Sequence, residues 1–294
     1  MRAWLVPVLW LALGLSPALS PAAPALGEAA AAPVRVATLL PFVEDALREA
    51  PGDALLVASV RRSLHAPTPD DVADLGNPHA PSLESLTAAR PQLVVGDASL
   101  HARLRPQLER SGAEVLLLDT ASVDATFAGL LALGRRVGGE DAMRARVDAV
   151  RAAIETASLE QPRKVLVLFG APGSFYAMTE RTWLGDLAGR LGFENASPAA
   201  GGSERFPGLV ALSDEVVAGL TPDLVLLVSH GDPSAIRAAL ERRIRSGGAW
   251  RGLQRAASVE VLDPDLFAAN PGLGMASAAR ALAAFAPGPL AAGP

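Results

Sequence analysis

Short apolar runs of strand length alternate with helix-forming segments along most of the chain. The predicted strands are 34–39, 54–60, 92–96, 114–119, 164–169, 223–229 and 259–262. Between them, helical spacing of the apolar positions predicts helices at 82–90, 182–191, 214–220 and 233–245. Alternation of this kind is typical of mostly parallel sheets covered by helices, so the sequence predicts the α/β class.

The longest region without a predicted strand is 121–158. Apolar residues recur here at helical spacing, and Gly138 with Gly139 is the one break. We therefore expect two lobes, each a mostly parallel sheet covered by helices, joined by one long backbone helix. The predicted boundaries are 33–138 for the N-terminal lobe, 139–159 for the linking helix and 160–294 for the C-terminal lobe.

An internal repeat supports the division into two lobes. Residues 82–95 align without a gap on residues 213–226, at a constant offset of 131. The identical pairs are Ser82/Ser213, Glu84/Glu215, Pro91/Pro222, Leu93/Leu224 and Val94/Val225. Each copy is a Ser-capped helix with an acid in its first turn, followed by a Pro and a buried strand. Unrelated helix–strand units can also share this pattern without a duplication. Five identities in 14 ungapped positions nevertheless favour duplicated lobes.

The first thirty residues carry the features of an export signal. Arg2 precedes an apolar run from Ala3 to Leu15, and a tail rich in Ala and Pro follows. The run contains Pro7 and is shorter than the roughly 20 residues that a membrane span needs, which disfavours the alternative of a transmembrane anchor. We expect a signal peptide at 1–27 and a soluble, periplasmic, monomeric mature protein.

The composition narrows the function classes. Half of the 294 residues are hydrophobic and 19% are charged, which excludes a disordered chain, and the net charge of −5 argues against nucleic acid as a partner. The absence of Cys excludes disulfides, thiolate nucleophiles, Cys-ligated metals and a lipid anchor on Cys. No hydrolase, metalloprotease, phosphate-loop or dinucleotide motif is present. An exported hydrolase using His230 with Ser229 or Ser174 stays a remote alternative.

Two of the four His stand at positions that suit a binding site. His79 lies between two prolines in segment 76–81, directly before the first repeat helix, and His230 directly follows the strand of the second repeat. In open α/β sheets, ligands bind outside the carboxyl ends of strands, so these two residues can face one cleft from opposite lobes. Neutral imidazole is a good ligand for haem iron. His65 and His101 have the character of ordinary surface or loop residues.

These segments resemble a known family. The resemblance rests on residues 81–84 with 91–95, on Glu215 with residues 222–226, and on the helix between the two copies. The segments resemble those of the periplasmic binding proteins of the single-helix-linked type, which deliver iron–siderophores, haem and cobalamin to ABC importers. The resemblance implies a binding protein without enzymatic activity and an inner-membrane ABC permease as partner. It also implies that Glu84 and Glu215 dock on Arg residues of that permease.

A finer resemblance concerns the cargo. Segment 222–233 is similar to the haem-binding lipoproteins of Gram-positive surface haem-uptake systems, in which the His after this strand is an axial iron ligand. In those proteins a Gly-x-Pro-Met-x-Pro loop supplies the other ligand, and here His79 stands at the Met position. The resemblance implies haem as cargo, with His79 and His230 as ligands. Cobalamin or another corrinoid and ferric siderophore are the alternatives within the family.

Further side chains are expected at the same cleft. Met178 could replace His79 as ligand, and Tyr176, the only Tyr of the chain, could ligate as a phenolate. Arg181 and Arg205 are candidates for pairing with haem propionates or an anionic siderophore, because the guanidinium fork matches a carboxylate. A carrier of free divalent metal ions is a third class that the sequence leaves open.

Overall fold

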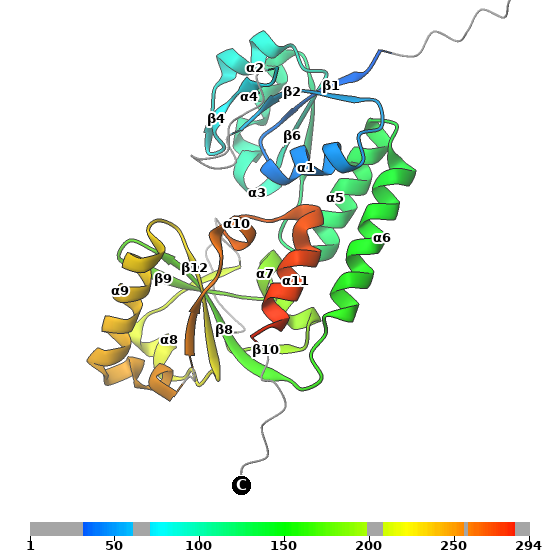
Figure 1. Ribbon diagram of the computed structural model, residues 1–294. Coiled ribbons are helices and arrows are strands. Elements are labelled where there is room, and N and C mark those ends of the chain that lie inside the picture. The colour runs from blue at the N-terminus through cyan, green and yellow to red at the C-terminus, as the bar shows by residue number, and fades with distance from the viewer. Residues whose placement is uncertain (1–31, 61–70, 199–207, 256–257, 286–294) are drawn as a thin grey trace, which may run out of the picture. The chain divides into compact units, whose positions relative to one another are not determined.

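The computed structural model describes residues 32–60, 71–198, 208–255 and 258–285. The expected signal peptide lies outside these residues. Two large sheets dominate the described chain, one built from its first half and one from its second half (Figure 1). Within the described ranges, no helix combines the length and the apolar character that crossing a bilayer requires.

The first sheet is entirely parallel. Its strand order is β3-β2-β1-β6-β7. The strands are β1 (Val34–Thr38), β2 (Ala54–Ser59), β3 (Ala73–Asp74), β6 (Leu93–Asp97) and β7 (Glu114–Leu118). Both faces are covered, because Leu93 and Val95 pack on the side of α1 (Pro41–Glu49) while Val94 packs on the side of α2 (Leu83–Ala89).

The second sheet is mixed, with strand order β11-β9-β8-β12-β13 and β10 paired beside β8. The strands are β8 (Arg163–Ala171), β9 (Ser174–Met178), β10 (Phe193–Asn195), β11 (Leu209–Ala211), β12 (Leu224–Ser229) and β13 (Ser258–Val261). Strands β8, β10, β12 and β13 are parallel, whereas β9 and β11 are antiparallel to their neighbours. The helices of this half are α7 (Trp183–Arg190), α8 (Asp214–Ala218), α9 (Pro233–Ser246) and the 3-10 helix η3 (Gly248–Arg255).

Short elements complete the two halves. In the first half these are β4 (Gly76–Asn77), β5 (Ala80–Pro81), α3 (Ala98–His101), η1 (Ala102–Leu104), α4 (Arg105–Leu108) and η2 (Glu109–Ser111). In the second half they are α10 (Pro264–Phe267) and η4 (Gly272–Gly274). Strand β9 was not among the predicted strands. It forms a hairpin with β8, in which Ala171 pairs with Ser174 and Gly173 adopts a positive φ of +82° in the two-residue turn.

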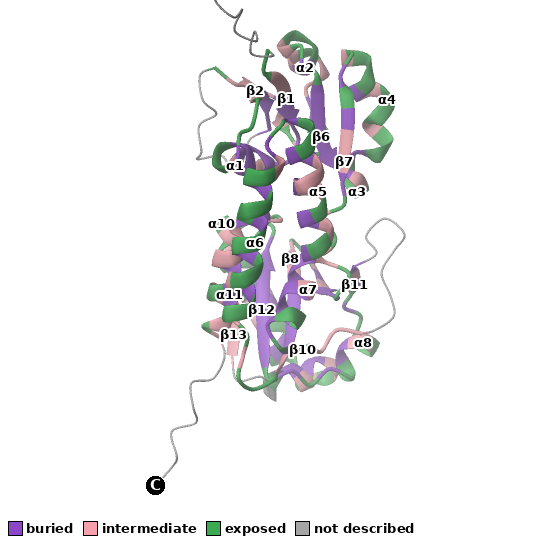
Figure 2. Cartoon of the chain, turned by 90° about the vertical axis from the view of Figure 1, so that its right-hand side faces the viewer, coloured by how far each residue is buried: buried purple, intermediate pink, exposed green. Residues whose placement is uncertain are grey.

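Three helices share one core with both sheets: α5 (Val123–Arg136), α6 (Glu140–Thr156) and α11 (Met275–Ala283). A single cluster of buried apolar side chains runs from β1 and β6 through these helices to β8 and β12. Figure 2 shows α6 with one buried and one exposed face beside the largely buried strands. The predicted α/β class, with two lobes and one long connecting helix, is confirmed. The boundaries at 138 and 160 stay a prediction.

The internal repeat corresponds to equivalent elements of the two lobes. Strand β6 begins at Leu93 and β12 at Leu224, and each lies between two parallel neighbours in its sheet. The hydroxyls of Ser82 and Ser213 accept hydrogen bonds from the first turns of α2 and α8, as the capping pattern predicts. The repeated sequence therefore encodes the same helix and central strand in both lobes.

Candidate functional site

A cavity of about 720 Å3 opens between the two lobes. Its lining includes residues at and after the carboxyl ends of β6 and β7, together with Phe169 and Val228 near the carboxyl ends of β8 and β12, so the cavity lies at the carboxyl ends of parallel strands from both sheets, where ligands of open α/β sheets bind. The lining residues are Asp97, Ala98, Ser99, Asp119, Thr120, Ala121, Ser122, Phe169, Met178, Glu180, Arg181, Thr182, Trp183, Gly208, Leu209, Val228, Phe267 and Ala268. The volume is within the range of small-molecule sites.

The two walls of this cavity differ in chemistry. The N-terminal lobe contributes mainly small polar and acidic side chains, whereas the C-terminal lobe contributes large apolar ones and the polar run Glu180, Arg181 and Thr182. Trp183, at the start of α7, and Phe267, in α10, are both buried and their rings stack at 6.4 Å with 11° between the planes. Trp183 therefore packs in the core, and its stack with Phe267 also forms part of the cavity wall.

On the polar wall, Asp97 is held at the end of β6. Its Oδ1 accepts hydrogen bonds from the backbone N–H groups of Ser99 and Leu100 at 2.7 and 2.9 Å, and its Oδ2 accepts from the hydroxyl of Thr120. Asp97 is 3% exposed. Asp97 was not among the expected site residues, although an Asp followed by a helical turn is a recognisable N-cap. Its carboxylate fixes the wall without requiring a ligand.

Two of the predicted binding residues line the cavity. Met178 is buried at the end of β9, and Arg181 is exposed in the loop before α7. Tyr176 is half-buried on β9, with its ring centroid 6.5 Å from that of Phe169. Arg205 lies outside the described residues. That Met178, Tyr176 and Arg181 contact a cargo stays a prediction.

His230 lies at the edge of the cavity. It directly follows β12, its side chain is exposed, and its backbone N–H donates to the carbonyl of Gly170 at 2.7 Å. Its imidazole stacks on Phe169 with centroids 5.8 Å apart and 30° between the planes. Because Phe169 lines the cavity, the ring of Phe169 lies between the cavity and the imidazole of His230.

His79 lies at the tip of the β4–β5 hairpin of the N-terminal lobe. Its side chain is exposed, and its backbone N–H donates to Oδ1 of Asn77 at 2.9 Å. The neighbouring carbonyl of Pro78 is bonded to His101, which is in turn bonded to the cavity residue Asp97. Among the described residues no ring contact or hydrogen bond joins His79 to His230, so their facing one another stays a prediction.

The prediction for His101 was wrong. Its imidazole is fully buried, and both ring nitrogens have hydrogen-bond partners. The reason is local, because Asp97 caps α3 and the four-residue turn carries His101 back under the end of β6. His65 lies outside the described residues.

The described residues contain no group of three or more His, Asp or Glu placed to hold a metal ion. A haem iron requires no such group, since the porphyrin supplies four ligands and the protein one or two. The hydrolase alternative gains no support from Ser229, whose buried hydroxyl has no hydrogen-bond partner in the described part of the chain. No nucleophile–base pair with His230 therefore forms there.

Behind the cavity, an ion cluster ties the connecting helices to the C-terminal lobe. Asp124 in α5 pairs with Arg190 of α7 at 2.6 Å and with Arg151 of α6 at 3.0 Å. The hydrogen bond from Arg190, reinforced by both positive charges, lowers the pKa of Asp124 despite partial burial. Asp186 of α7 also accepts from the backbone N–H of Val123 at 2.8 Å. The start of α5 is thus fastened to α7.

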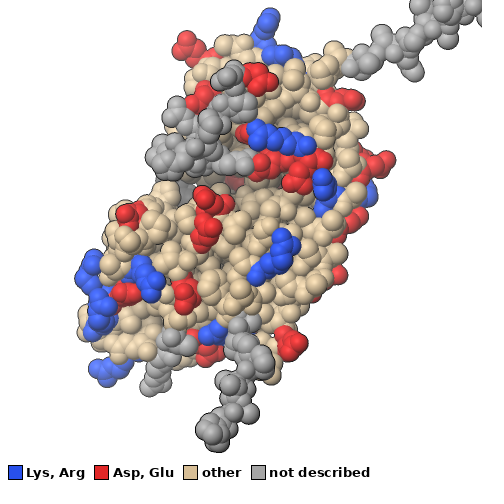
Figure 3. Space-filling view, viewed as in Figure 1, with Lys and Arg blue, Asp and Glu red and all other residues tan. Residues whose placement is uncertain are grey.

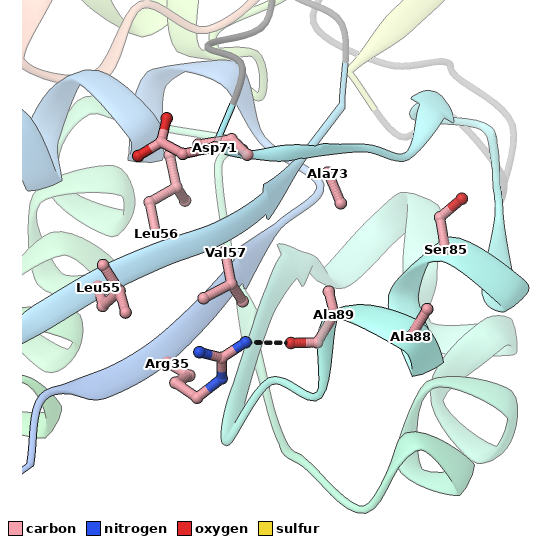
Figure 4. Close-up of a pocket in the computed structure, with 10 residues that line it drawn as sticks. Arg35, Leu55, Leu56, Val57, Asp71, Ala73, Ser85, Ala88 and Ala89 are labelled. Carbon is pink, nitrogen blue, oxygen red and sulfur yellow. Dashed lines mark hydrogen bonds between the residues drawn. The ribbon is translucent and has the colours of Figure 1, made fainter.

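A second hollow, of about 650 Å3, lies on the N-terminal lobe alone (Figure 4). It is bordered by β2, β3 and the end of α2. Among the described residues that line it, only Arg35 carries a guanidinium, which is already bonded to the carbonyls of Ala89 and Arg90. The cavity between the lobes is larger and takes residues from both sheets, so it is the stronger candidate site.

The two acids expected to dock on a permease are both exposed. Glu84 and Glu215 lie in the first turns of α2 and α8. Neighbouring Asp214 is instead bonded to the indole N–H of Trp250 at 2.9 Å, which leaves Glu215 as the outward acid of that turn. Figure 3 shows positive side chains gathered at the position of α9, whose exposed arginines are Arg237, Arg242, Arg243 and Arg245. Docking by Glu84 and Glu215 stays a prediction.

The chain is similar to several known binding proteins. The chain is 22% identical over 198 residues to the high-affinity heme uptake system protein IsdE of Staphylococcus aureus, an alignment that covers 66% of each chain and thus just under two thirds of the relative. An ABC transporter substrate-binding protein from Listeria monocytogenes matches with a TM-score of 0.73 and 22% identity, over 85% of this chain and 97% of that one.

Two ligand-bound structures share the fold. S. aureus IsdE complexed with heme matches with a TM-score of 0.71 and 20% identity, over 85% of this chain and 98% of that one. The triscatecholate siderophore binding protein FeuA from Bacillus subtilis, complexed with ferri-bacillibactin, matches with a TM-score of 0.66 and 15% identity, over 85% and 92%. A family model described as periplasmic binding protein matches residues 56–208, which is more than half of the chain. The protein belongs to the periplasmic binding protein family.

Proposed function

We propose that the protein captures haem in the cavity between its lobes and delivers it to the permease of an ABC importer. One observation carries the proposal: an aromatic and apolar cavity wall continues directly into an exposed imidazole. Phe169 belongs to that wall and stacks on His230. An apolar surface beside a free imidazole is the combination that a porphyrin with an axially open iron requires.

The walls match the parts of haem. Burying the porphyrin plate against Phe169, Met178 and the Trp183–Phe267 stack stabilises the complex by about 25 cal/mol for each Å2 of apolar surface removed from water. The propionates pair with Arg181, whose guanidinium suits a carboxylate, and lie away from Asp97 and Asp119 on the wall of the N-terminal lobe. His230 from one lobe and His79 from the other serve as axial ligands, which gives a bis-imidazole iron.

The relatives support haem and also provide the second candidate. IsdE is named for heme uptake, and its structure holds heme. FeuA holds a ferric siderophore within the same fold. An oxygen-rich chelate can accept a hydrogen bond from the hydroxyl of Ser122 on the polar wall, whereas the hydroxyls of Ser99 and Thr120 already donate to Asp97. At 22% identity the fold admits either cargo, and cobalamin is the third.

The proposal includes the route and the partner. The segment 1–27 directs export, so that the mature protein acts as a soluble periplasmic monomer without catalysis. Glu84 and Glu215, one on each lobe and both exposed, form the contacts with arginines of the permease. Opposite charges on exposed surfaces steer the encounter and fix its orientation more than they add affinity.

Haem titration of the purified apoprotein tests the cargo. We expect saturation at one equivalent and the absorption spectrum of low-spin, six-coordinate iron. His230→Phe retains the aromatic stack on Phe169 but has no ligating nitrogen, so it should bind haem more weakly and give a five-coordinate or water-ligated spectrum. His79→Met keeps an iron ligand and should stay six-coordinate with a raised reduction potential, because a Met/His pair favours ferrous iron more than a His/His pair does.

Matched controls separate the site from general damage. Arg181→Ala should weaken haem binding, whereas Arg242→Ala, which removes an exposed Arg of α9, should leave it unchanged. Haem binding with equal affinity and an equal spectrum in wild type and in the His79→Ala, His230→Ala double variant would refute the ligand assignment. Tight binding of a corrinoid or a ferric siderophore, with no saturable haem binding, would replace haem as the cargo.

A further inference from the structure

His101 is a fully buried imidazole that lies outside the cavity wall. Its Nδ1 is 2.8 Å from the backbone nitrogen of Asp97, and its Nε2 is 2.9 Å from the carbonyl oxygen of Pro78. A backbone N–H can only donate and a carbonyl can only accept. The two partners therefore require a neutral ring that carries its proton on Nε2.

The ring occupies a space left for it beneath the end of β6. A Cβ on Gly96 would come within 3.1 Å of Nδ1 of His101 and within 3.1 Å of Leu117. The absence of a side chain at this position lets the imidazole reach the backbone of Asp97. The neighbouring strand residues thus accommodate the ring in one orientation.

The partner at Nε2 is the tip of a very short hairpin. Strands β4 and β5 have two residues each, with Gly76 opposite Pro81 and Asn77 opposite Ala80, so Pro78 and His79 form the turn. A two-stranded hairpin is marginally stable in water by itself. The bond from the N–H of His79 to Oδ1 of Asn77 lies within the hairpin, whereas the bond from Nε2 of His101 to the carbonyl of Pro78 ties the tip to the lobe.

The tether continues through the cavity wall to the C-terminal part of the chain. The hydroxyl of Thr120 donates to Asp97, and the carbonyl of Thr120 accepts from Nδ2 of Asn270 at 3.2 Å. Asn270 also donates to the hydroxyl of Thr126 at 2.8 Å. A chain of hydrogen bonds therefore joins the His79 hairpin to the segment that follows α10.

We propose that His101 is a positioning residue that holds the His79 hairpin against the cleft without touching the cargo. It fixes where the His79 ring can reach, so the affinity for the cargo depends on a side chain outside the cavity wall. The role of His79 as a ligand rests on the proposed function, whereas the tether of the hairpin does not. The two statements are tested by separate measurements.

Hydrogen exchange of the apoprotein tests the tether. Two variants are compared, each of which can keep a different one of the two hydrogen bonds that the His101 ring forms. His101→Asn places an amide near the position of Nδ1 and loses the bond to Pro78, while His101→Gln reaches the position of Nε2 and can still donate to Pro78. Amides of residues 75–82 should exchange faster in His101→Asn than in wild type, with His101→Gln between them. Equal exchange of this segment in all three folded proteins would overturn the proposal, whatever the cargo.

Haem binding by a double-mutant cycle tests the consequence for the ligand. In an otherwise wild-type protein His101→Asn should weaken haem binding about three- to tenfold, which corresponds to the loss of one hydrogen bond. It should also reduce the low-spin, six-coordinate features of the absorption spectrum that depend on His79. In the His79→Ala background the same substitution should change neither. Additive losses in the two backgrounds would show that His101 acts on the fold alone and would overturn the positioning role. If wild type binds no haem, the proposed function fails, and the exchange rates still decide the tether.

Discussion

Gly272→Ala should destabilise the protein far more than an ordinary glycine substitution. Gly272 opens η4 with φ at +55°, the left-handed region, and a Cβ there would lie 2.5 Å from Cδ2 and 2.9 Å from Cγ of Phe42. Phe42 belongs to α1 of the N-terminal lobe and is 4% exposed. The glycine is therefore the point at which the C-terminal segment packs against the first lobe with no room for a methyl group.

The magnitude follows from two separate costs. A left-handed conformation costs an L-residue about 1–2 kcal/mol. Forcing a methyl group into a packed contact adds about 1–3 kcal/mol. Replacing Gly with Ala also reduces the conformational freedom of the unfolded chain, which stabilises the folded state by about 0.4–1 kcal/mol. We expect a net loss of about 2–4 kcal/mol in the free energy of unfolding of Gly272→Ala.

Gly112→Ala is the matched control, because Gly112 has φ at +83° but nothing within 4 Å of its Cβ position. It carries the backbone cost alone and should lose about 1 kcal/mol. Urea denaturation of both variants, with equal slopes against denaturant, measures the difference. Replacing Phe42 with Leu should reduce the cost of Gly272→Ala, since the ring atoms are removed. Equal losses for the two glycine variants would refute the close contact between η4 and α1.

Three further outcomes follow from the contacts between and within the lobes. Asp124→Asn should lower stability by about 0.5–1 kcal/mol at neutral pH, since the pair with Arg190 is partly exposed, and the difference should vanish as the pH falls through the lowered pKa of Asp124; urea denaturation at several pH values measures it. Arg243→Lys should lose about 1 kcal/mol, because the guanidinium lies 5.5 Å from the ring centre of Phe175 and 5.4 Å from that of Trp250, and thermal melting checks it. X-ray scattering should show little change in the radius of gyration on cargo binding, since one core spans both lobes; a large decrease would contradict the shared core.

The central strands of both lobes could be predicted because their residues are buried on both faces. Strands β6 and β12 each begin with an uninterrupted run of Leu and Val and are preceded by a Pro and a Ser-capped helix, so local rules and burial agree. Strand β9 could not be predicted in this way. It is a short antiparallel strand with a mixed burial pattern, and its pairing depends on the turn at Gly173 and on β11, which is distant in sequence.

Some residues of the candidate site could be predicted from the sequence and others could not. Met178 and Arg181 were expected at the cleft and line its cavity, although antiparallel β9 first carries the chain back along β8 from Ser174 to Met178. The part played by His101 could not be predicted, since both of its partners are backbone atoms that any sequence would supply. Only the fold brings the carbonyl of Pro78, 23 residues away, to its ring.

The shared core limits how far the two lobes can rotate against each other. Because α5, α6 and α11 pack on both sheets, and Asn270 bonds across to Thr120 and Thr126, large rotation of one lobe against the other would expose buried apolar surface at about 25 cal/mol for each Å2. Elements at the edge of the cavity, such as the His79 hairpin, can move at far smaller cost, because each is held by few bonds. The difference between empty and loaded protein should therefore be local to the edge of the cleft, with Glu84 and Glu215 kept at a nearly constant separation.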